Sequence, residues 1–231
     1  MSNYWRFSRT AYYSAVAALP LLVIYEILIV VSQSQYWGIR NAADVWIRTF
    51  LMAFDLQAHH ITFVLIGISL ALIPIAKSRA RGVKLKANYF ALMFAESLAL
   101  SLVLGVFLQT ILQMGGLSSG GTGSGLMQNI ALSVGAGLFE EIIFRVIILN
   151  LLFLLLSPVF KKKVVTAVVS VLIASFLFSL SHYVGNMADS WQLYSFMFRW
   201  AAGLLFTVLY FVRGFAITAY THALYDIWVL V

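Results

Sequence analysis

Seven long apolar segments dominate this chain of 231 residues and limit what it can fold into. They lie near residues 11–32, 59–76, 88–113, 127–156, 164–184, 193–212 and 215–231. A helix of about 20 apolar residues can cross the hydrocarbon core of a bilayer. Strand alternation is absent, and only helices or closed barrels satisfy backbone polar groups in lipid. We therefore predict an all-α, polytopic transmembrane helical bundle of about seven spans, with six to eight as the range.

The composition excludes a soluble domain and narrows the chemistry. Hydrophobic residues make up 62% of the chain and charged residues only 10%, whereas soluble domains average about 45–50% and about 25%. The chain has no cysteine, so disulfides, thiolate catalysis and cysteine-based zinc sites are excluded. The net charge of +7 comes from short basic loops, so we expect a lipid bilayer and no nucleic acid as its partner.

The basic residues predict how the bundle is oriented, because loops on the cytoplasmic side carry an excess of Lys and Arg. With a cytoplasmic N-terminus, every inner loop is basic and the outer side holds only Arg40 and Arg48. The inner residues are Arg6, Arg9, the basic residues of segment 77–87, Lys161, Lys162, Lys163 and Arg213. We expect a multi-pass protein of a bacterial-type cytoplasmic membrane.

The organisation along the chain follows from these segments. We predict one integral membrane domain over residues 1–231, with the motifs that carry chemistry in the half 127–231. Residues 33–58 mix charges with aromatic side chains, which favours an amphipathic segment at the outer interface. Residues 77–87 form a basic cytoplasmic loop, and the Gly- and Ser-rich residues 114–126 form an extracytoplasmic linker.

Ionisable residues inside the spans are the main candidates for function, because each costs about 2.5–3.5 kcal/mol at the centre of a membrane helix. Glu141 and Arg145 are four positions apart, so they share a helix face and form a favourable pair. Glu140 is rotated from Glu141 by about 100°, which leaves it free for chemistry. Two further carboxylates, Glu26 and Glu96, need partners, and Arg199 is a candidate for either.

Two histidines extend this candidate site. Phe178 and His182 are four positions apart, so the ring can pack beside the imidazole, and His222 and Asp226 have the same spacing. Two imidazoles and a carboxylate around one water make a hydrolase constellation. In it Glu140 activates water, His182 positions it and His222 stabilises the oxyanion. Two histidines and a carboxylate are also a known zinc set, so a divalent metal such as zinc, if present, has Glu140, His182, His222 and Asp226 as its ligands.

Together these motifs resemble the CPBP family of intramembrane proteases (CAAX protease and bacteriocin-processing, also called Abi), which is related to the type II CAAX prenyl endopeptidases. The matching residues are Glu140-Glu141-xxx-Arg145, Phe178-xxx-His182 and His222-xxx-Asp226, all in the C-terminal half. The resemblance implies an endopeptidase, either glutamate-dependent or metal-dependent, that hydrolyses a peptide bond of a membrane-associated protein or peptide.

The resemblance also implies a role for each residue. Glu140 and His182 activate the attacking water, and His222 with Asp226 corresponds to the oxyanion pair. Many relatives carry asparagine at the last position, so Asp226 is either protonated or orients His222 instead. Glu141, Arg145 and Phe178 have a structural role and hold the catalytic residues in place.

Two other functions stay open at this point. The same side chains could form the relay of a proton- or ion-coupled transporter, or the chain could be a non-catalytic immunity or scaffold member of the same fold.

A site that contains both His182 and His222 requires the two residues to lie at the same depth in the membrane. At 1.5 Å per residue, His182 lies about 28 Å from Lys163 but His222 only about 14 Å from Arg213. The two meet only if helices tilt or if the turn near Gly214 enters the bundle.

Overall fold

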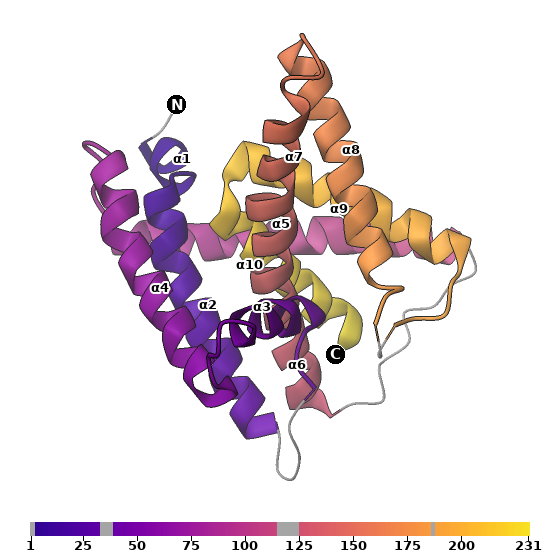
Figure 1. Ribbon diagram of the computed structural model, residues 1–231, viewed down its shortest axis with the longest axis horizontal. Helices are drawn as coiled ribbons and strands as arrows, with labels where there is room; N and C mark the ends of the chain where they lie inside the picture. Colours follow the sequence, from indigo (N-terminus) through magenta and orange to yellow (C-terminus); the bar gives the residue numbers. More distant parts are fainter. Residues whose placement is uncertain (1–2, 33–38, 115–124, 186–187) are drawn as a thin grey trace.

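The structure is a computed structural model that describes residues 3–32, 39–114, 125–185 and 188–231. Within these residues every regular element is a helix, which confirms the predicted all-α fold class (Figure 1). The α-helices are α1 (Asn3–Ser8), α2 (Ala11–Ser32), α3 (Ala42–Met52), α4 (Ala58–Arg79), α5 (Ala87–Met114), α6 (Leu126–Gly135), α7 (Leu149–Leu156), α8 (Lys163–Ser181), α9 (Leu193–Arg213) and α10 (Phe215–Leu230). Two π-helical segments, η1 (Ala136–Glu140) and η2 (Ile142–Ile148), lie between α6 and α7.

Among the described residues, five helices are long and apolar enough to cross a membrane: α2, α4, residues Ala87–Ile111 of α5, α8 and α9. The predicted span 127–156 is divided among α6, η1, η2 and α7, and the predicted span 215–231 is the 16-residue α10. The number of about seven spans therefore stays a prediction. The predicted linker falls largely on residues 115–124, and residues 33–38 open the predicted interfacial segment; both stretches lie outside the described residues.

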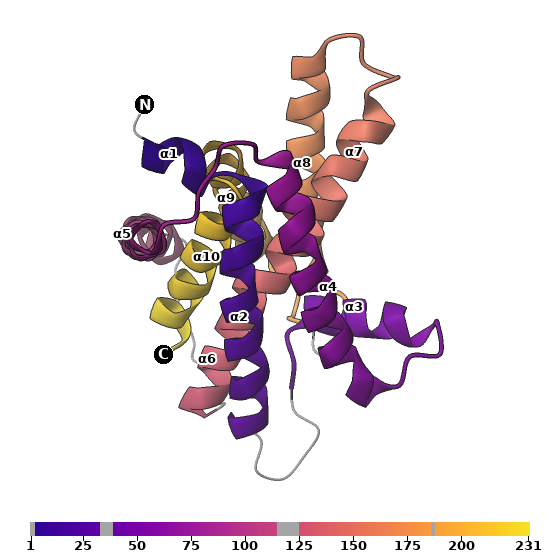
Figure 2. The ribbon, with the colours of Figure 1, turned by 90° about the vertical axis from the view of Figure 1, so that its left-hand side faces the viewer.

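The helices do not all run in the same direction. α2, α4, α6 and α7 run roughly vertically in Figure 1, whereas α5 crosses behind them and is seen end-on in Figure 2. The N-terminus, the turn after α4 and the turn between α7 and α8 lie at the upper end of the molecule in Figure 1. These segments carry most of the basic loop residues, so the arrangement agrees with the orientation that the charges predict.

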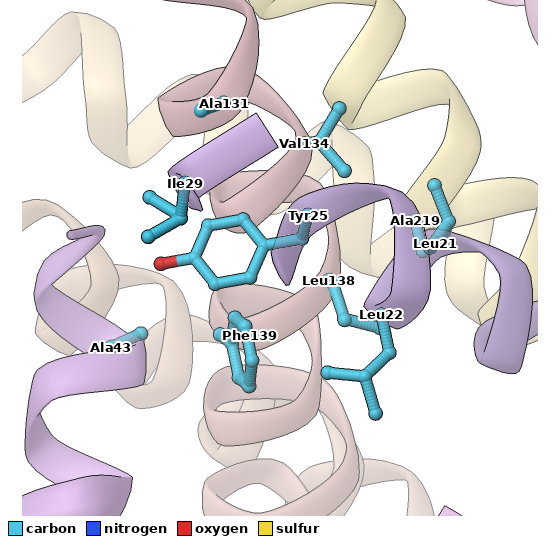
Figure 3. Packing of buried hydrophobic residues seen from close by; sticks show 10 residues of the cluster. All are labelled: Leu21, Leu22, Tyr25, Ile29, Ala43, Ala131, Val134, Leu138, Phe139 and Ala219. Atoms are coloured by element: carbon cyan, nitrogen blue, oxygen red, sulfur yellow. The ribbon is translucent and has the colours of Figure 1, made fainter. Parts of the chain in front are cut away.

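The principal core joins α2 to the helical run α6–η1. Leu21, Leu22, Tyr25 and Ile29 of α2 pack against side chains of α6 and η1, with Ala43 of α3 and Ala219 of α10 at its borders (Figure 3). The Tyr25 ring meets the Phe139 ring edge to face, with centroids 5.1 Å apart. This contact places α2 directly beside the segment that carries Glu140 and Glu141.

A network of four charges joins α2 to the start of α3. Arg40 Nη2 lies 3.0 Å from Glu26 Oε2, and Arg40 Nη1 lies 2.9 Å from Asp44 Oδ2. Arg48 pairs with the same two acids, at 2.7 Å from Asp44 Oδ1, and Thr62 of α4 donates a hydrogen bond to Glu26. Burial tends to lower the pKa of Arg40, but the hydrogen bonds and charges of Glu26 and Asp44 outweigh it and raise that pKa above its ordinary value. Two positive and two negative groups cancel, which makes their burial tolerable.

This network gives α3 an inverted amphipathic character. Asp44 and Arg48 are buried, whereas Phe50 is 63% exposed and Trp46 is 39% exposed. The polar face of α3 therefore contacts α2, and its aromatic face points outward, where lipid can cover it. We predicted an amphipathic segment here, but the sequence did not show that its charges would face inward.

The predicted partners of two carboxylates were wrong. Arg199 pairs with Asp189 rather than with Glu26 or Glu96. Glu96 of α5 instead pairs with Arg213, whose Nη2 lies 2.7 Å from Glu96 Oε2. Arg213 is only 2% exposed, so it is a buried bundle residue and not a loop charge as predicted. The error arose because linear order does not show that α5 packs beside α9 and α1.

The charge network predicts the effect of Asp44→Asn. The substitution leaves Arg40 and Arg48 with one carboxylate between them, and breaking a buried ion pair costs about 3 to 5 kcal/mol. We expect a clearly lower melting temperature for the purified protein in detergent. Asp55→Asn is the matched control, because Asp55 is exposed and has no ion pair among the described residues. Equal melting temperatures for the two variants would contradict the account.

Candidate functional site

The helical run that carries the glutamate motif is wound more widely than an α-helix. We predicted one continuous α-helix over 127–156, but residues 136–140 and 142–148 are π-helical. Short π-helical stretches are rare and occur frequently at functional sites. Hydropathy and spacing carry no signal for this winding.

Two glycines let neighbouring helices approach this run closely. A Cβ atom on Gly137 would lie 2.6 Å from the Cβ of Ala223 in α10. A Cβ atom on Gly135 would lie 2.5 Å from Tyr25 Cε2 and 3.0 Å from Asn41 Cβ. Small residues allow such backbone approach in membrane helices, where packing replaces the hydrophobic effect as the driving force.

Glu141 lies at the centre of a fully buried cluster. Its Oε1 is 3.2 Å from Arg145 Nη1, so the predicted pair is present, and 2.7 Å from His222 Nδ1. Arg145 also lies over the Phe178 ring at 4.6 Å and donates a hydrogen bond to the Gly203 carbonyl at 3.2 Å. Glu141 therefore does more than pair with Arg145, because it also binds the His222 imidazole of the candidate site.

His222 is held on three sides. Nδ1 faces Glu141, Nε2 lies 3.6 Å from Asp226 Oδ2, and the ring stacks on Phe206 with centroids 4.4 Å apart. A separation of 3.6 Å is too long for a hydrogen bond, so Asp226 acts on His222 through its charge. The pairing of His222 with Asp226 was predicted from their spacing, whereas its contact with Glu141 was not.

Glu140 and His182 share a small cavity of about 40 Å³. Ala42, Ala43, Trp46, Phe144 and Ser181 complete the lining of this cavity. His182 Nδ1 lies 3.0 Å from the Phe178 carbonyl oxygen. A carbonyl only accepts hydrogen bonds, so Nδ1 carries the proton and Nε2 is left as the basic nitrogen.

The two histidines meet across one aromatic ring. The Phe178 ring packs edge to face against His182 at 5.2 Å and against His222 at 6.1 Å. Both imidazoles also act electrostatically on the Glu140 carboxylate. The condition on depth is met, since both imidazoles contact the same ring. The half-buried turn at Gly214 packs against the N-terminal segment, where an added Cβ would lie 2.9 Å from the Arg9 carbonyl oxygen.

One residue of the site was not predicted at all. Asn41 Nδ2 donates a hydrogen bond to Glu140 Oε1 at 2.8 Å, although 99 positions separate the two residues. An asparagine before a helical segment could have been recognised as an N-cap, which it is for α3. No local pattern shows that the same side chain reaches Glu140.

The comparison with protein families assigns the part of the chain that holds all three motifs. Residues 122–228 match the family model described as Rce1-like, type II CAAX prenyl endopeptidase Rce1-like. This segment is an Rce1-like domain. The match agrees with the resemblance to the CPBP family. No curated protein and no solved structure matches the chain.

The Rce1-like domain does not present an evident metal centre. In the part of the chain that the structure describes, no three His, Asp or Glu side chains are grouped so that they could hold a metal ion. His222 already uses one ring nitrogen for Glu141 and turns the other toward Asp226. The four predicted ligands do not form such a group among the described residues, and a metal at this site stays a prediction.

The packing of the Rce1-like domain predicts the effect of Gly137→Ala. The new methyl group collides with α10 near Ala223 and separates His222 from Glu141. Overpacking of this kind costs about 1 to 3 kcal/mol, so thermal unfolding in detergent should occur at a lower temperature. Gly67→Ala is the matched control, because a Cβ there meets nothing within 4 Å. A Gly137→Ala variant as stable as this control would show that the close approach is not required.

Proposed function

We propose that the protein is an intramembrane endopeptidase that cleaves a membrane-associated protein or peptide near its end. Membership of residues 122–228 in the Rce1-like family supports hydrolysis of a peptide bond. One observation carries the assignment to particular residues: Glu140 and His182 line the same small cavity, beside a much larger apolar groove. The protein acts in a bacterial-type cytoplasmic membrane, with its basic loops on the inner side.

The small cavity is where we place the attacking water. Glu140 takes a proton from this water, and Nε2 of His182 accepts its other hydrogen bond. The oxygen attacks the carbonyl carbon of the scissile bond, and the proton held by Glu140 then passes to the leaving nitrogen. The reaction yields a new carboxylate and a new amine.

His222 stabilises the negative oxygen that forms during the attack. Glu141 and Asp226 flank its ring and keep it in place. A ring N–H that is fixed in advance stabilises a developing charge without reorganisation, which is the largest catalytic effect in many hydrolases. Asp226 lies near the ring nitrogen and not in the water cavity, which supports an orienting role.

The apolar groove is suited to the substrate. It has a volume of about 1100 Å³ and lies among α2, α3, α4, the π-helical run and the start of α10. Trp46 lines both the groove and the small cavity, and Phe139 of the groove precedes Glu140 in the chain. A lipid-like chain or an apolar peptide in the groove would bring a neighbouring peptide bond to Glu140. The family description makes a prenylated C-terminal CAAX peptide the first substrate to test.

The proposal predicts loss of cleavage in two variants, Glu140→Gln and His182→Gln. Removal of a general base lowers the rate about 100- to 10,000-fold. The assay uses the purified protein in lipid vesicles with a farnesylated CAAX peptide, and product is measured by mass spectrometry. His60→Gln is the control for His182→Gln, since His60 is exposed at the start of α4. Normal cleavage by Glu140→Gln would contradict the assignment.

The same assay separates the substrate class from the function. Cleavage of the farnesylated peptide but not of the unmodified peptide assigns the groove to the prenyl chain. Cleavage of both assigns it to apolar peptide. Ion flux without any cleavage, dependent on Glu141 and Asp226, would instead favour the transporter.

Removal of metal ions is predicted to leave the reaction intact. The proposed mechanism needs only Glu140, His182 and His222, and the described residues hold no grouped metal-ligand set. We therefore expect equal rates before and after dialysis against a strong chelator such as 1,10-phenanthroline. Loss of activity that zinc restores would contradict this part of the account and assign the four predicted ligands a metal.

A further inference from the structure

The side-chain amide of Asn41 has only one possible orientation. Its Oδ1 accepts a hydrogen bond from the backbone N–H of Ala43 at 2.9 Å, as the N-cap of α3. The other end of the amide is therefore the NH₂ group, and this group donates to Glu140 Oε1 at 2.8 Å. The start of α3 thus fixes which atom faces Glu140.

The backbone of Asn41 is held as firmly as its side chain. Its N–H donates to the Tyr25 hydroxyl at 3.3 Å, and this hydroxyl donates to Asp44 Oδ2 at 2.8 Å. Figure 3 shows the Tyr25 hydroxyl directed toward the helix that carries Ala43. Asp44 is bound in turn by Arg40 and Arg48. The charge network therefore ends on the residue that contacts Glu140.

The Glu140 helix leaves room for this contact. Gly135 lies where Tyr25 and Asn41 approach, and a methyl group there would lie within 3.0 Å of both. Asn41 is itself 9% exposed, and it is not among the residues that line the apolar groove. Its contacts serve the carboxylate and the start of α3, and not the substrate.

We propose that Asn41 is a positioning residue that fixes the carboxylate of Glu140 for its attack on water. The bond to Oε1 leaves Oε2 as the oxygen that receives the proton from the water in the cavity. This inference rests on the endopeptidase function proposed above. It extends the site beyond residues 122–228, because Asn41 and the charge network belong to the N-terminal half. The N-terminal helices are then part of the machinery and not only a membrane anchor.

Two substitutions separate positioning from helix capping. Asn41→Asp and Asn41→Ser both keep an oxygen that can cap α3, but neither can donate an amide N–H to Glu140. Asn41→Asp also places a second carboxylate beside the first. The control Asn150→Ser removes an amide that, among the described residues, bonds to the backbone carbonyls of Arg145 and Val146.

We expect kcat of Asn41→Ser to fall about 10- to 100-fold with KM unchanged, because misplacement of a reacting group has effects of this size. For Asn41→Asp the acidic limb of the pH profile should also move to higher pH, because a second acid disfavours ionised Glu140. The other charged or titratable groups that act on Glu140 stay the same in both variants; they are His182, His222, Arg145 and Asp226.

Comparison with Glu140→Ala makes the outcomes distinct. Wild-type kcat in both Asn41 variants, with Glu140→Ala inactive, would overturn the inference and leave the proposed function standing. Cleavage by Glu140→Ala, or none by the wild type, would contradict the proposed function instead. In that second case, a double-mutant cycle that compares melting temperatures still tests the hydrogen bond between Asn41 and Glu140. Non-additive shifts for Asn41→Ser and Glu140→Ala support the hydrogen bond, and additive shifts overturn it.

Discussion

A charge inside a membrane protein needs a partner of opposite sign, and this requirement determines how the helices of this chain are joined. Three acids illustrate this: Glu26 meets Arg40 and Arg48, Glu96 meets Arg213, and Glu141 meets both Arg145 of its own helical run and His222 of α10. Lipid cannot solvate these groups, so an error in packing would leave a costly unpaired charge. The pairs therefore fix how neighbouring helices are aligned. The segments concerned are α2, α3, α5, α9, α10 and the π-helical run.

Close packing of helices at two glycines also determines where the site residues lie. Gly135 and Gly137 lie on the turn before Glu140 and Glu141, and each receives a neighbouring helix where a side chain would collide. One approach brings Asn41 to Glu140, and the other brings His222 to Glu141. Two adjacent carboxylates consequently enter different surroundings. Glu141 is fully buried among permanent partners, whereas Glu140 faces a cavity where water fits.

Much of this could be predicted from local sequence. Apolar length indicated helices in a membrane, and four-residue spacing placed Glu141 with Arg145, Phe178 with His182 and His222 with Asp226, all of which are in contact. The π-helical winding, the partners of Glu26 and Glu96, and the contact of Asn41 with Glu140 were not predicted. Each depends on which distant segments become neighbours, and spacing along one helix carries no information about that.

We propose that Glu140 and His182 activate water to cut a peptide bond. This role is tested by mass spectrometry of a farnesylated CAAX peptide after incubation with the purified protein in vesicles prepared in ¹⁸O-labelled water. We expect a shortened peptide with ¹⁸O in its new carboxyl group for the wild type and no product for Glu140→Gln. An intact peptide with the wild type, or labelled product with Glu140→Gln, would contradict it.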